Sequence, residues 1–471
     1  MPESGTTTFT LLQNTLTQPG HGHQTQHQDA ATFVRRPASC VALDVRPRGA
    51  RRRMHSRRLS LVWLLAGTLV GTTARGQGRL PAVDTVGPAI VFDGQGLRIR
   101  SVDAKRQLRM RGVIQFDAPR LWLGAAPAGT SAFVIRRARM TMDVVLSPQL
   151  AMRLMPDFSA NGSVGLEDAF VDVSLARATW LRVGRFRTPY GQERANLILD
   201  QFFPERSLLS SLTSNRDQGF QLTHETRGRQ FEFTAALLNG VPDNASGFTD
   251  ANADKDIDAR VIWRPAQRTV QGAAQGVSLG INGTRGRQTA KGADAQLPVL
   301  TTPSGVTWFS YRGGTNATQA DGWRERVGGF AQLHRQRLSL NAEVVHNSAE
   351  LRRTDSRARV TTTGVLALGA WSLTGEPSSQ IGLIPRDANG AWQLTARASR
   401  VRVSGSAFPT FVEADLAPRA AMESGVALNW YLQRQTKLQL AGELIRFSGG
   451  AAGGTNRATE RYVTLRMQVI L

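Results

Sequence analysis

Residues 107–117, QLRMRGVIQFD, alternate between apolar and polar side chains over nearly their whole length. Leu108, Met110, Ile114 and Phe116 fall on one face, while arginines, a glutamine and an aspartate occupy the other. A period of two predicts a β-strand that buries one face in an apolar phase and exposes the other to water.

The same alternation recurs along the chain. Residues 167–175 (EDAFVDVSL) and 256–265 (DIDARVIWRP) repeat it, and residues 461–471 (RYVTLRMQVIL) carry it to the last position, Leu471. Beyond residue 76 there is neither an apolar run of 18 residues nor a helical layer to cover these faces. The apolar faces therefore meet either lipid, in a transmembrane antiparallel β-barrel, or each other, in a secreted sandwich or propeller. The many strands of about ten residues favour the barrel.

The features of a secretory signal peptide lie at residues 54–76. Arg57 and Arg58 precede an apolar core, and Ala74 and Gly76 have the small-residue spacing of a cleavage site. We therefore expect four parts. They are a mis-called or disordered upstream extension (1–53), the signal peptide (54–76), a periplasmic lead-in (77–105) and an all-β barrel of about 16 strands (106–471).

Charge and cysteine content exclude several classes of function. The net charge is +22, and the single cysteine, Cys40, lies upstream of the predicted cleavage site. An exported basic chain would not meet nucleic acid, and without cysteine it forms no disulfide framework. Three scattered histidines beyond residue 76 argue against a zinc site, and no Gly-x-Ser-x-Gly elbow supports a hydrolase. We expect no enzyme activity, cofactor or metal.

A calcium-loop spacing occurs at residues 250–256, DANADKD. The sixth position, which needs glycine, is Lys255, and the twelfth, which needs glutamate, is Val261. The segment is therefore interpreted as a solvated turn.

Residues 183–209, VGRFRTPYGQERANLILDQFFPERSLL, begin as a strand and break at Pro189 and Gly191. Apolar clusters and two further arginines follow, which suits neither a regular strand nor an ordinary polar loop. Several segments, in this order, resemble the phosphate-selective porin O and P family across residues 107–265: FVIRRARMTMDVVLSPQLAMRLMPDF, LEDAFVDV, LRVGRFRTPYGQE with FFPERSL, NRDQGFQL, and FTAALLNG with DANADKDIDARVIWRP.

The resemblance implies a trimeric outer-membrane porin of 16 strands, with a loop folded into the barrel as a constriction. Residues 183–209 would contain that loop, held by Leu197, Ile198, Leu199, Phe202 and Phe203. The pore-constriction candidates are arginines of the RRAR run, the arginine after Gly-Arg-Phe and two loop arginines that are expected to face water: Arg137, Arg139, Arg187, Arg194 and Arg206.

Strand parity predicts further residues that line the pore. Ile135 shares the inward parity, whereas Arg136 has lipid-side parity and is expected at an interface or a bulge. Arginine at the bilayer midplane would cost roughly 2–4 kcal/mol. The predicted pore-lining residues are Arg109, Arg111, Arg153, Asp168, Arg182, Arg260 and Arg264. Each of these arginines is either selective for anions or only a solvated charge paired with a carboxylate.

The sequence thus predicts passive, anion-selective diffusion across a Gram-negative outer membrane. Planar, charged guanidinium groups suit phosphate oxygens, provided that binding stays weak and multi-site. Phosphate or polyphosphate as the solute, and a homotrimer in outer-membrane lipid, follow from the resemblance. The alternatives are a general anion or small-solute porin and a non-conducting receptor.

Overall fold

The computed structural model describes residues 89–471 apart from five short segments. The segments left out are 94–95, 125–131, 161–162, 248–252 and 290–296. The predicted signal peptide and upstream extension lie outside the described residues.

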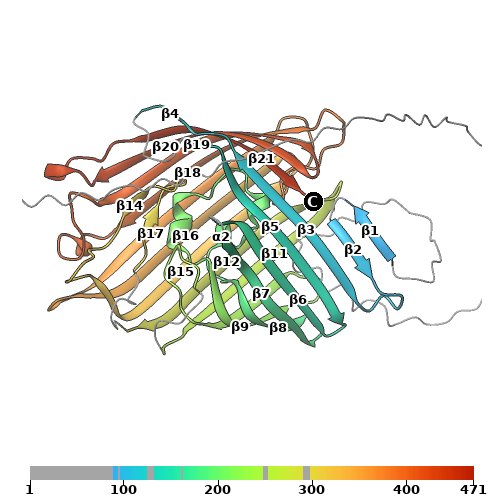
Figure 1. The fold of residues 1–471 in the computed structure, drawn as a ribbon, viewed down its shortest axis with the longest axis horizontal. Helices are drawn as coiled ribbons and strands as arrows, with labels where there is room; N and C mark the ends of the chain where they lie inside the picture. Colours follow the sequence, from blue (N-terminus) through green and yellow to red (C-terminus); the bar gives the residue numbers. More distant parts are fainter. Residues whose placement is uncertain (1–88, 94–95, 125–131, 161–162, 248–252, 290–296) are drawn as a thin grey trace, which may run out of the picture. The chain divides into compact units, whose positions relative to one another are not determined.

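Sixteen antiparallel strands form a closed barrel (Figure 1), as predicted. Each wall strand pairs with the next one along the chain, and β21 pairs with β3 to close the ring. The wall strands are β3 (Gln107–Asp117), β5 (Val134–Ser147), β6 (Leu150–Ala160), β7 (Ser163–Ala176), β8 (Thr179–Arg187), β9 (Arg216–Glu225), β10 (Phe231–Leu238), β11 (Asp256–Val270), β12 (Ala273–Gln288), β15 (Gln319–Arg335), β16 (Leu338–Arg353), β17 (Ser356–Ser372), β18 (Ala391–Val403), β19 (Pro418–Gln433), β20 (Thr436–Gly449) and β21 (Glu460–Ile470).

The outer face of the wall is apolar, as the alternation predicts. On β21, Leu465 and Met467 are exposed outside, whereas their neighbours Thr464, Arg466 and Gln468 are buried inside. Among the described residues, no helix has both the length and the apolar character needed to cross a membrane.

A bulge corrects one predicted orientation. Gln115 of β3 lies opposite Arg137, but the next residue, Phe116, lies opposite Ile135, so Arg136 is the extra residue of the bulge. Ile135 is 57% exposed and shares the outer face with Phe116. The expectation that Ile135 faces the lumen was wrong because the bulge shifts the parity by one residue, whereas the expectation of a bulge at Arg136 is confirmed.

The longest loops lie at the end of the barrel opposite the C-terminus, and most turns at the other end are short. Turns such as 148–149, 177–178 and 434–435 are on the same side as the C-terminus, and the loops 188–215 and 404–417 are on the other. In outer-membrane barrels the short turns are periplasmic and the long loops extracellular. We use these names for the two ends.

The extracellular half of the lumen contains a group of buried apolar side chains packed against β16–β21, which we call the apolar cluster. Wall residues such as Val345, Val401 and Ile445 pack there on loop residues such as Leu209 and Trp308, and all five are fully or almost fully buried. Short elements of the loops supply the rest: β13 (Leu300–Thr301), β14 (Thr307–Phe309) and the 3₁₀ turn η4 (Gly405–Ala407). This part of the lumen is therefore filled with protein.

Four further short elements lie at the two ends of the barrel. The hairpin β1 (Ala89–Asp93) and β2 (Gly96–Arg100) pairs with the first residues of β3, within the stretch predicted only as a lead-in. At the other end, β4 (Leu121–Trp122) pairs with β21, and the turn η5 (Ala452–Gly454) precedes β21.

Candidate functional site

The segment between β8 and β9, residues 188–215, leaves the wall and folds into the lumen, as predicted. Pro189 lacks an N–H donor for the strand ladder, and Gly191 adopts a φ of 84°, which favours glycine. A side chain at Gly191 would also collide with Thr213, whose Cγ2 would lie 2.5 Å from the added Cβ. The chain then forms α2 (Gln192–Ala195), η1 (Ile198–Asp200) and η2 (Leu208–Leu212). We call residues 188–215 the constriction loop.

Apolar residues of the constriction loop pack on the inner wall. Of the five residues expected to hold the loop, Ile198, Phe202 and Phe203 are buried, whereas Leu197 and Leu199 are only half-buried. Leu208 and Leu209 of η2, which were not predicted, are fully buried in the apolar cluster. Tyr190 near the start of the loop belongs to the same cluster, so apolar packing holds the loop near both of its ends.

Wall carboxylates bind the backbone of the constriction loop. Glu343 of β16 accepts hydrogen bonds from the backbone N–H groups of Gln192 and Glu193 at 2.6 and 2.8 Å. Glu423 of β19 accepts one from the N–H of Leu208 at 2.8 Å. These bonds satisfy donors that would otherwise lack a partner in the dry interior.

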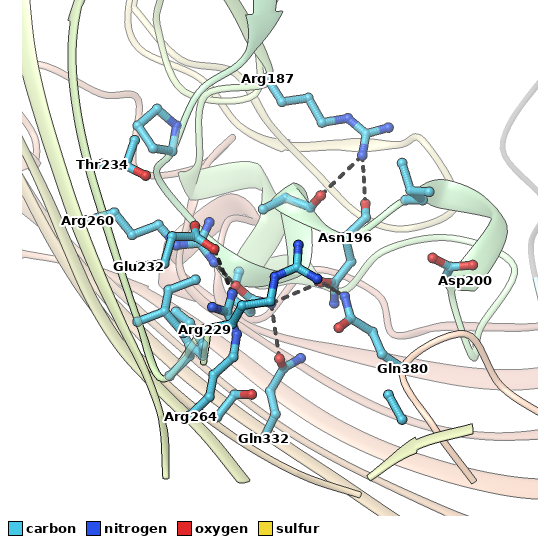
Figure 2. Close-up of a pocket in the computed structure, with 18 of the residues that line it drawn as sticks. Arg187, Asn196, Asp200, Arg229, Glu232, Thr234, Arg260, Arg264, Gln332 and Gln380 are labelled. Carbon is cyan, nitrogen blue, oxygen red and sulfur yellow. Dashed lines mark hydrogen bonds and ion pairs between the residues drawn. The ribbon is translucent and has the colours of Figure 1, made fainter. Parts of the chain in front are cut away.

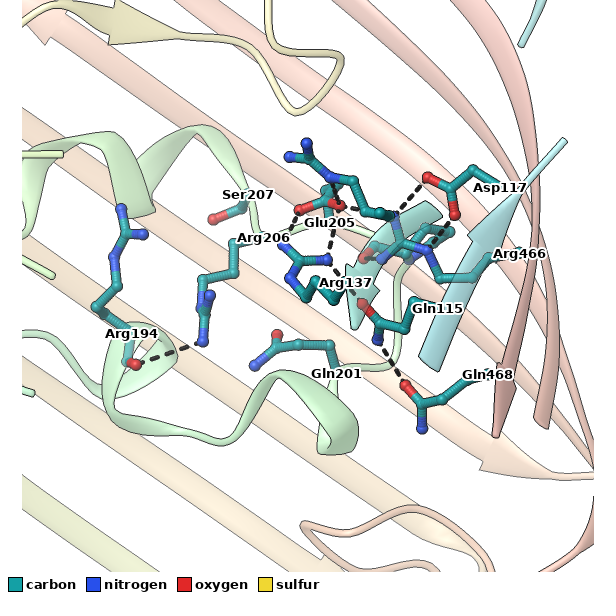
Figure 3. A network of polar contacts seen from close by, with 12 residues as sticks. Gln115, Asp117, Arg137, Arg194, Gln201, Glu205, Arg206, Ser207, Arg466 and Gln468 are labelled. Atoms are coloured by element: carbon teal, nitrogen blue, oxygen red, sulfur yellow. Dashed lines mark hydrogen bonds and ion pairs between the residues drawn. The ribbon is translucent and has the colours of Figure 1, made fainter. Parts of the chain in front are cut away.

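A second anchor is the cluster around Glu205 in the constriction loop, shown in Figure 3. Its carboxylate contacts Arg136 at 2.8 Å, Arg137 at 2.9 Å and Arg466 at 2.6 Å. Burial alone would raise the pKa of Glu205, but these guanidinium groups hold that pKa well below its usual value. Arg466 also binds Asp117, so one loop carboxylate ties together β3, β5 and β21.

Arg187 and Arg206 form no ion pair among the described residues and donate to the same backbone acceptor of the constriction loop. Arg187, at the end of β8, donates hydrogen bonds to the backbone carbonyls of Asn196 at 3.0 Å and Ala195 at 3.3 Å. Arg206 donates to the same Asn196 carbonyl at 2.9 Å and to that of Glu193 at 3.2 Å. Arg187 and Arg206 thus share one acceptor oxygen, and we call them the arginine pair.

The arginine pair carries more positive charge than its surroundings neutralise. Burial lowers the pKa of Arg206 well below its usual value, and the nearby charges of Arg194 and Arg187 lower it further. The Nε of Arg187 is buried and has no hydrogen-bond partner. An anion that reached these two groups would neutralise charge that the protein leaves uncompensated.

Arg187 lines a cavity of about 400 Å³ on the periplasmic side of the constriction loop (Figure 2). The periplasmic turn 373–390 enters the lumen here, where the Gln380 amide donates to the Asn196 side chain at 2.7 Å. Asp200 of the constriction loop also lines the cavity. Burial raises the pKa of Asp200 to about 7, although Lys437, Arg187 and Arg111 oppose that shift.

The other predicted constriction residues already contact groups of the same chain. Arg137 binds Glu205, and Arg139 binds Asp157 at 2.6 Å and also Glu167. Arg194, which was expected to face water, is buried and donates a hydrogen bond to the Ser210 carbonyl of the constriction loop.

Most predicted pore-lining arginines are paired as well. Arg111 and Arg153 share Asp143 at 2.5 and 2.6 Å, Arg182 binds Asp172 at 2.8 Å, and Arg264 binds Glu232 at 2.6 Å. Arg260 instead donates to the side chain of Gln192, and Arg109 makes other contacts. The cavity lining contains Arg153, Asp168, Arg182, Arg260 and Arg264.

Arg216, the first residue of β9, belongs to the site but was not predicted from the sequence. It is 2% exposed and forms ion pairs with Asp168 and Glu167. The segment NRDQGFQL contains it, but strand parity alone does not reveal its two partners.

The acidic segment 250–256 also differs from its interpretation. Residues 250–252 lie outside the described residues. Asp256 begins β11, is 2% exposed and pairs with Arg324 at 2.7 Å and Arg326 at 3.3 Å. The expectation that Asp256 belongs to a solvated turn was wrong, because its carboxylate is buried and paired with two arginines of the wall. No group of residues suited to hold a metal ion occurs in the described part of the chain.

Comparison with solved structures finds other outer-membrane barrels. The outer-membrane channel DcaP of Acinetobacter baumannii matches with a TM-score of 0.52 and 9% identity over 79% of this chain and 99% of its own. An anion-selective porin from Comamonas acidovorans matches with a TM-score of 0.48 and 10% identity over 78% of this chain and 100% of its own. No curated protein sequence matches significantly.

The model of a protein family, phosphate-selective porin O and P, matches residues 108–469, which include nearly the whole barrel. With its closed 16-stranded wall and infolded loop, the chain belongs to the phosphate-selective porin O and P family and is an outer-membrane channel.

Proposed function

We propose that this channel passes anions by passive diffusion, selects them at the arginine pair, and has phosphate or polyphosphate as its preferred solute. The observation that carries the proposal is that Arg187 and Arg206 share the Asn196 carbonyl and have no carboxylate partner among the described residues. The family supports phosphate as the solute.

Most of the remaining lumenal arginines act as a neutral framework, because carboxylates compensate them. Ion pairs such as Arg182 with Asp172 and Arg264 with Glu232 fix the wall side chains and contribute little net field. The uncompensated charge is thereby concentrated at the constriction loop. Low-dielectric walls focus such a field into the lumen and raise the local anion concentration.

Weak binding at the arginine pair favours transport over trapping. Both guanidinium groups already donate to backbone carbonyls, so an anion has to compete for their N–H groups. Guanidinium forks match phosphate oxygens, and conduction requires that the ion also leaves again. We further propose that the barrels assemble as a homotrimer, as the family resemblance implies.

A general anion or small-solute porin is the second candidate. The carboxylates of Asp200, Glu225 and Glu232 also line the cavity, which favours weaker discrimination between solutes. Phosphate block separates the two candidates.

The test is the chloride current of the purified protein in a planar bilayer, titrated with phosphate and, in parallel, with sulfate. A phosphate-binding pore should show a block by phosphate that weakens at least about tenfold in Arg206→Ala, about 1.4 kcal/mol of lost binding. Equal block by both anions, unchanged in the variant, would favour the general porin. The absence of conductance would favour a receptor.

A further inference from the structure

We propose that outward-facing arginines at the extracellular ends of β18–β21 bind the phosphorylated headgroup of the outer-leaflet saccharolipid, lipid A. We call the four residues Arg400, Arg402, Arg446 and Arg461 the outer arginine patch. The patch lies on the outside of the barrel, so the inference is independent of the proposed anion selectivity.

The orientation of the patch follows from strand parity. On β18, Ser399, Val401 and Val403 are buried inside, and the alternate residues Arg400 and Arg402 are exposed. Arg446 and Arg461 occupy the same exposed parity on β20 and β21. These arginines therefore lie on the lipid-facing side of the wall.

No acidic side chain accompanies the patch on these four strands. The glutamates of β19–β21 all point inward and are buried: Glu423, Glu443 and Glu460. The four arginines have no ion pair among the described residues. By contrast, the outward arginines on β12 and β17 face carboxylates: Arg285 lies 3.3 Å from Glu325, and Arg359 lies 2.8 Å from Glu350.

The height of the patch matches the outer headgroup region. At the periplasmic end of β18, Trp392 stacks on Trp430 of β19 with ring centroids 5.0 Å apart, as expected for an interfacial aromatic girdle. Arg402 lies ten residues further along the strand. At about 3.3 Å per residue and a tilt of about 40°, the two residues are separated by about 25 Å along the membrane normal, the height of the apolar band.

The lateral spacing suits a headgroup with more than one phosphate. Arg400 lies opposite Met422, and Met422 lies opposite Arg446, so two strand spacings of about 4.8 Å place the arginines about 10 Å apart. That span is comparable with a disaccharide that carries a phosphate on each ring. Arg461 extends the row onto β21.

An apolar surface lies between the patch and the periplasmic ends of the strands. The exposed outward residues there are Leu394, Val426, Leu440 and Leu465. A lipid whose phosphates contact the arginines would therefore lay its acyl chains on a complementary surface. Guanidinium forks bind phosphate through paired hydrogen bonds, so charge and apolar complementarity favour the same occupant.

The test measures binding of diphosphorylated lipid A to the purified protein in detergent by native mass spectrometry. The variant is R400Q/R446Q, and the matched control is R285Q/R287Q, which removes two outward arginines on β12. Dephosphorylated lipid A and inorganic phosphate serve as the two comparison ligands. All positions are exposed on the surface, and heat-modifiable migration on gels verifies that the barrels are folded.

We expect R400Q/R446Q to bind diphosphorylated lipid A at least tenfold more weakly, with the control within twofold of the unmodified protein. The dephosphorylated lipid should not distinguish the proteins, and the reversal potential should stay unchanged. Equal binding by both variants would overturn the proposal. Competition by inorganic phosphate at the concentration of the lipid would also overturn the proposal. Dissociation of R400Q/R446Q oligomers would overturn it as well, because the patch would then be a subunit interface.

Discussion

At the scale of single residues, the two-residue period predicts which way a side chain points. The parity of Leu465 and Met467 on β21 is confirmed, because one face of a strand in this wall must be apolar. The prediction fails at Ile135, where a single bulged residue, Arg136, reverses the assignment. Parity is a local property, and a bulge depends on the partner strand.

The partner of an arginine is not predictable in the same way. Arg397 of β18 binds Glu423 and Glu443, and Arg466 of β21 binds Asp117 of β3. These carboxylates lie on other strands, which strand pairing and, for Asp117, closure of the ring bring to the arginines. The sequence therefore predicted the arginines of the lumen, but not that Arg187 and Arg206 would share one backbone acceptor and form no ion pair.

Asp200 should make anion selectivity depend on pH. Its pKa is raised to about 7, so the carboxyl group is neutral below that pH and becomes charged above it. A negative charge near Arg187 weakens the attraction for anions, so selectivity should fall as pH rises through 7.

Reversal potentials in a KCl gradient on either side of pH 7 measure this effect, because chloride does not titrate there. Asp200→Asn should remove most of the dependence and keep the higher selectivity at all pH values. A pH profile identical in the variant would mean that another group titrates.

At the scale of elements, the family resemblance and the pattern of residues both predicted the constriction loop. The break at Pro189 and Gly191 and the apolar residues around Phe202 predicted a loop packed on the inner wall. The short helical turns and the wall carboxylate of Glu343 that binds the loop backbone were not predictable. They depend on strands more than 100 positions further along the chain.

Glu205 should anchor the constriction loop. Glu205→Gln removes the charge that neutralises Arg136, Arg137 and Arg466, and breaking a buried ion pair typically costs about 3–5 kcal/mol. We expect a displaced loop, seen as higher and more fluctuating single-channel conductance. Glu413→Gln is the control, because Glu413 forms an exposed ion pair with Arg312, which is worth little. A quiet channel with unchanged conductance would contradict the role of Glu205.

The apolar cluster should also stabilise the constriction loop. Leu209 is fully buried, so Leu209→Ala should lower the free energy of unfolding by about 2–5 kcal/mol. Leu416→Ala is the control, because Leu416 is 69% exposed. Equilibrium unfolding in denaturant compares the two variants, and equal stability would show that the cluster does not hold the loop.

At the scale of the whole molecule, the lumen is divided between two environments. The wall around β6–β12 borders the cavity with its ion pairs, and the wall of β16–β21 packs on the apolar cluster. Composition and period predicted the barrel and its approximate strand number. They did not predict this division, because inward valines and leucines such as Val345 and Leu366 show the same alternation as polar lumen residues.

We propose that the arginine pair creates the anion selectivity of the channel. The direct measurement is the reversal potential of the purified protein in a planar bilayer under a KCl gradient, compared with Arg187→Gln/Arg206→Gln. Arg434→Gln, in an exposed periplasmic turn, is the control for the loss of positive charge elsewhere. We expect an anion-selective potential that the control retains and that the double variant moves most of the way to zero. An unchanged potential in the double variant would contradict it.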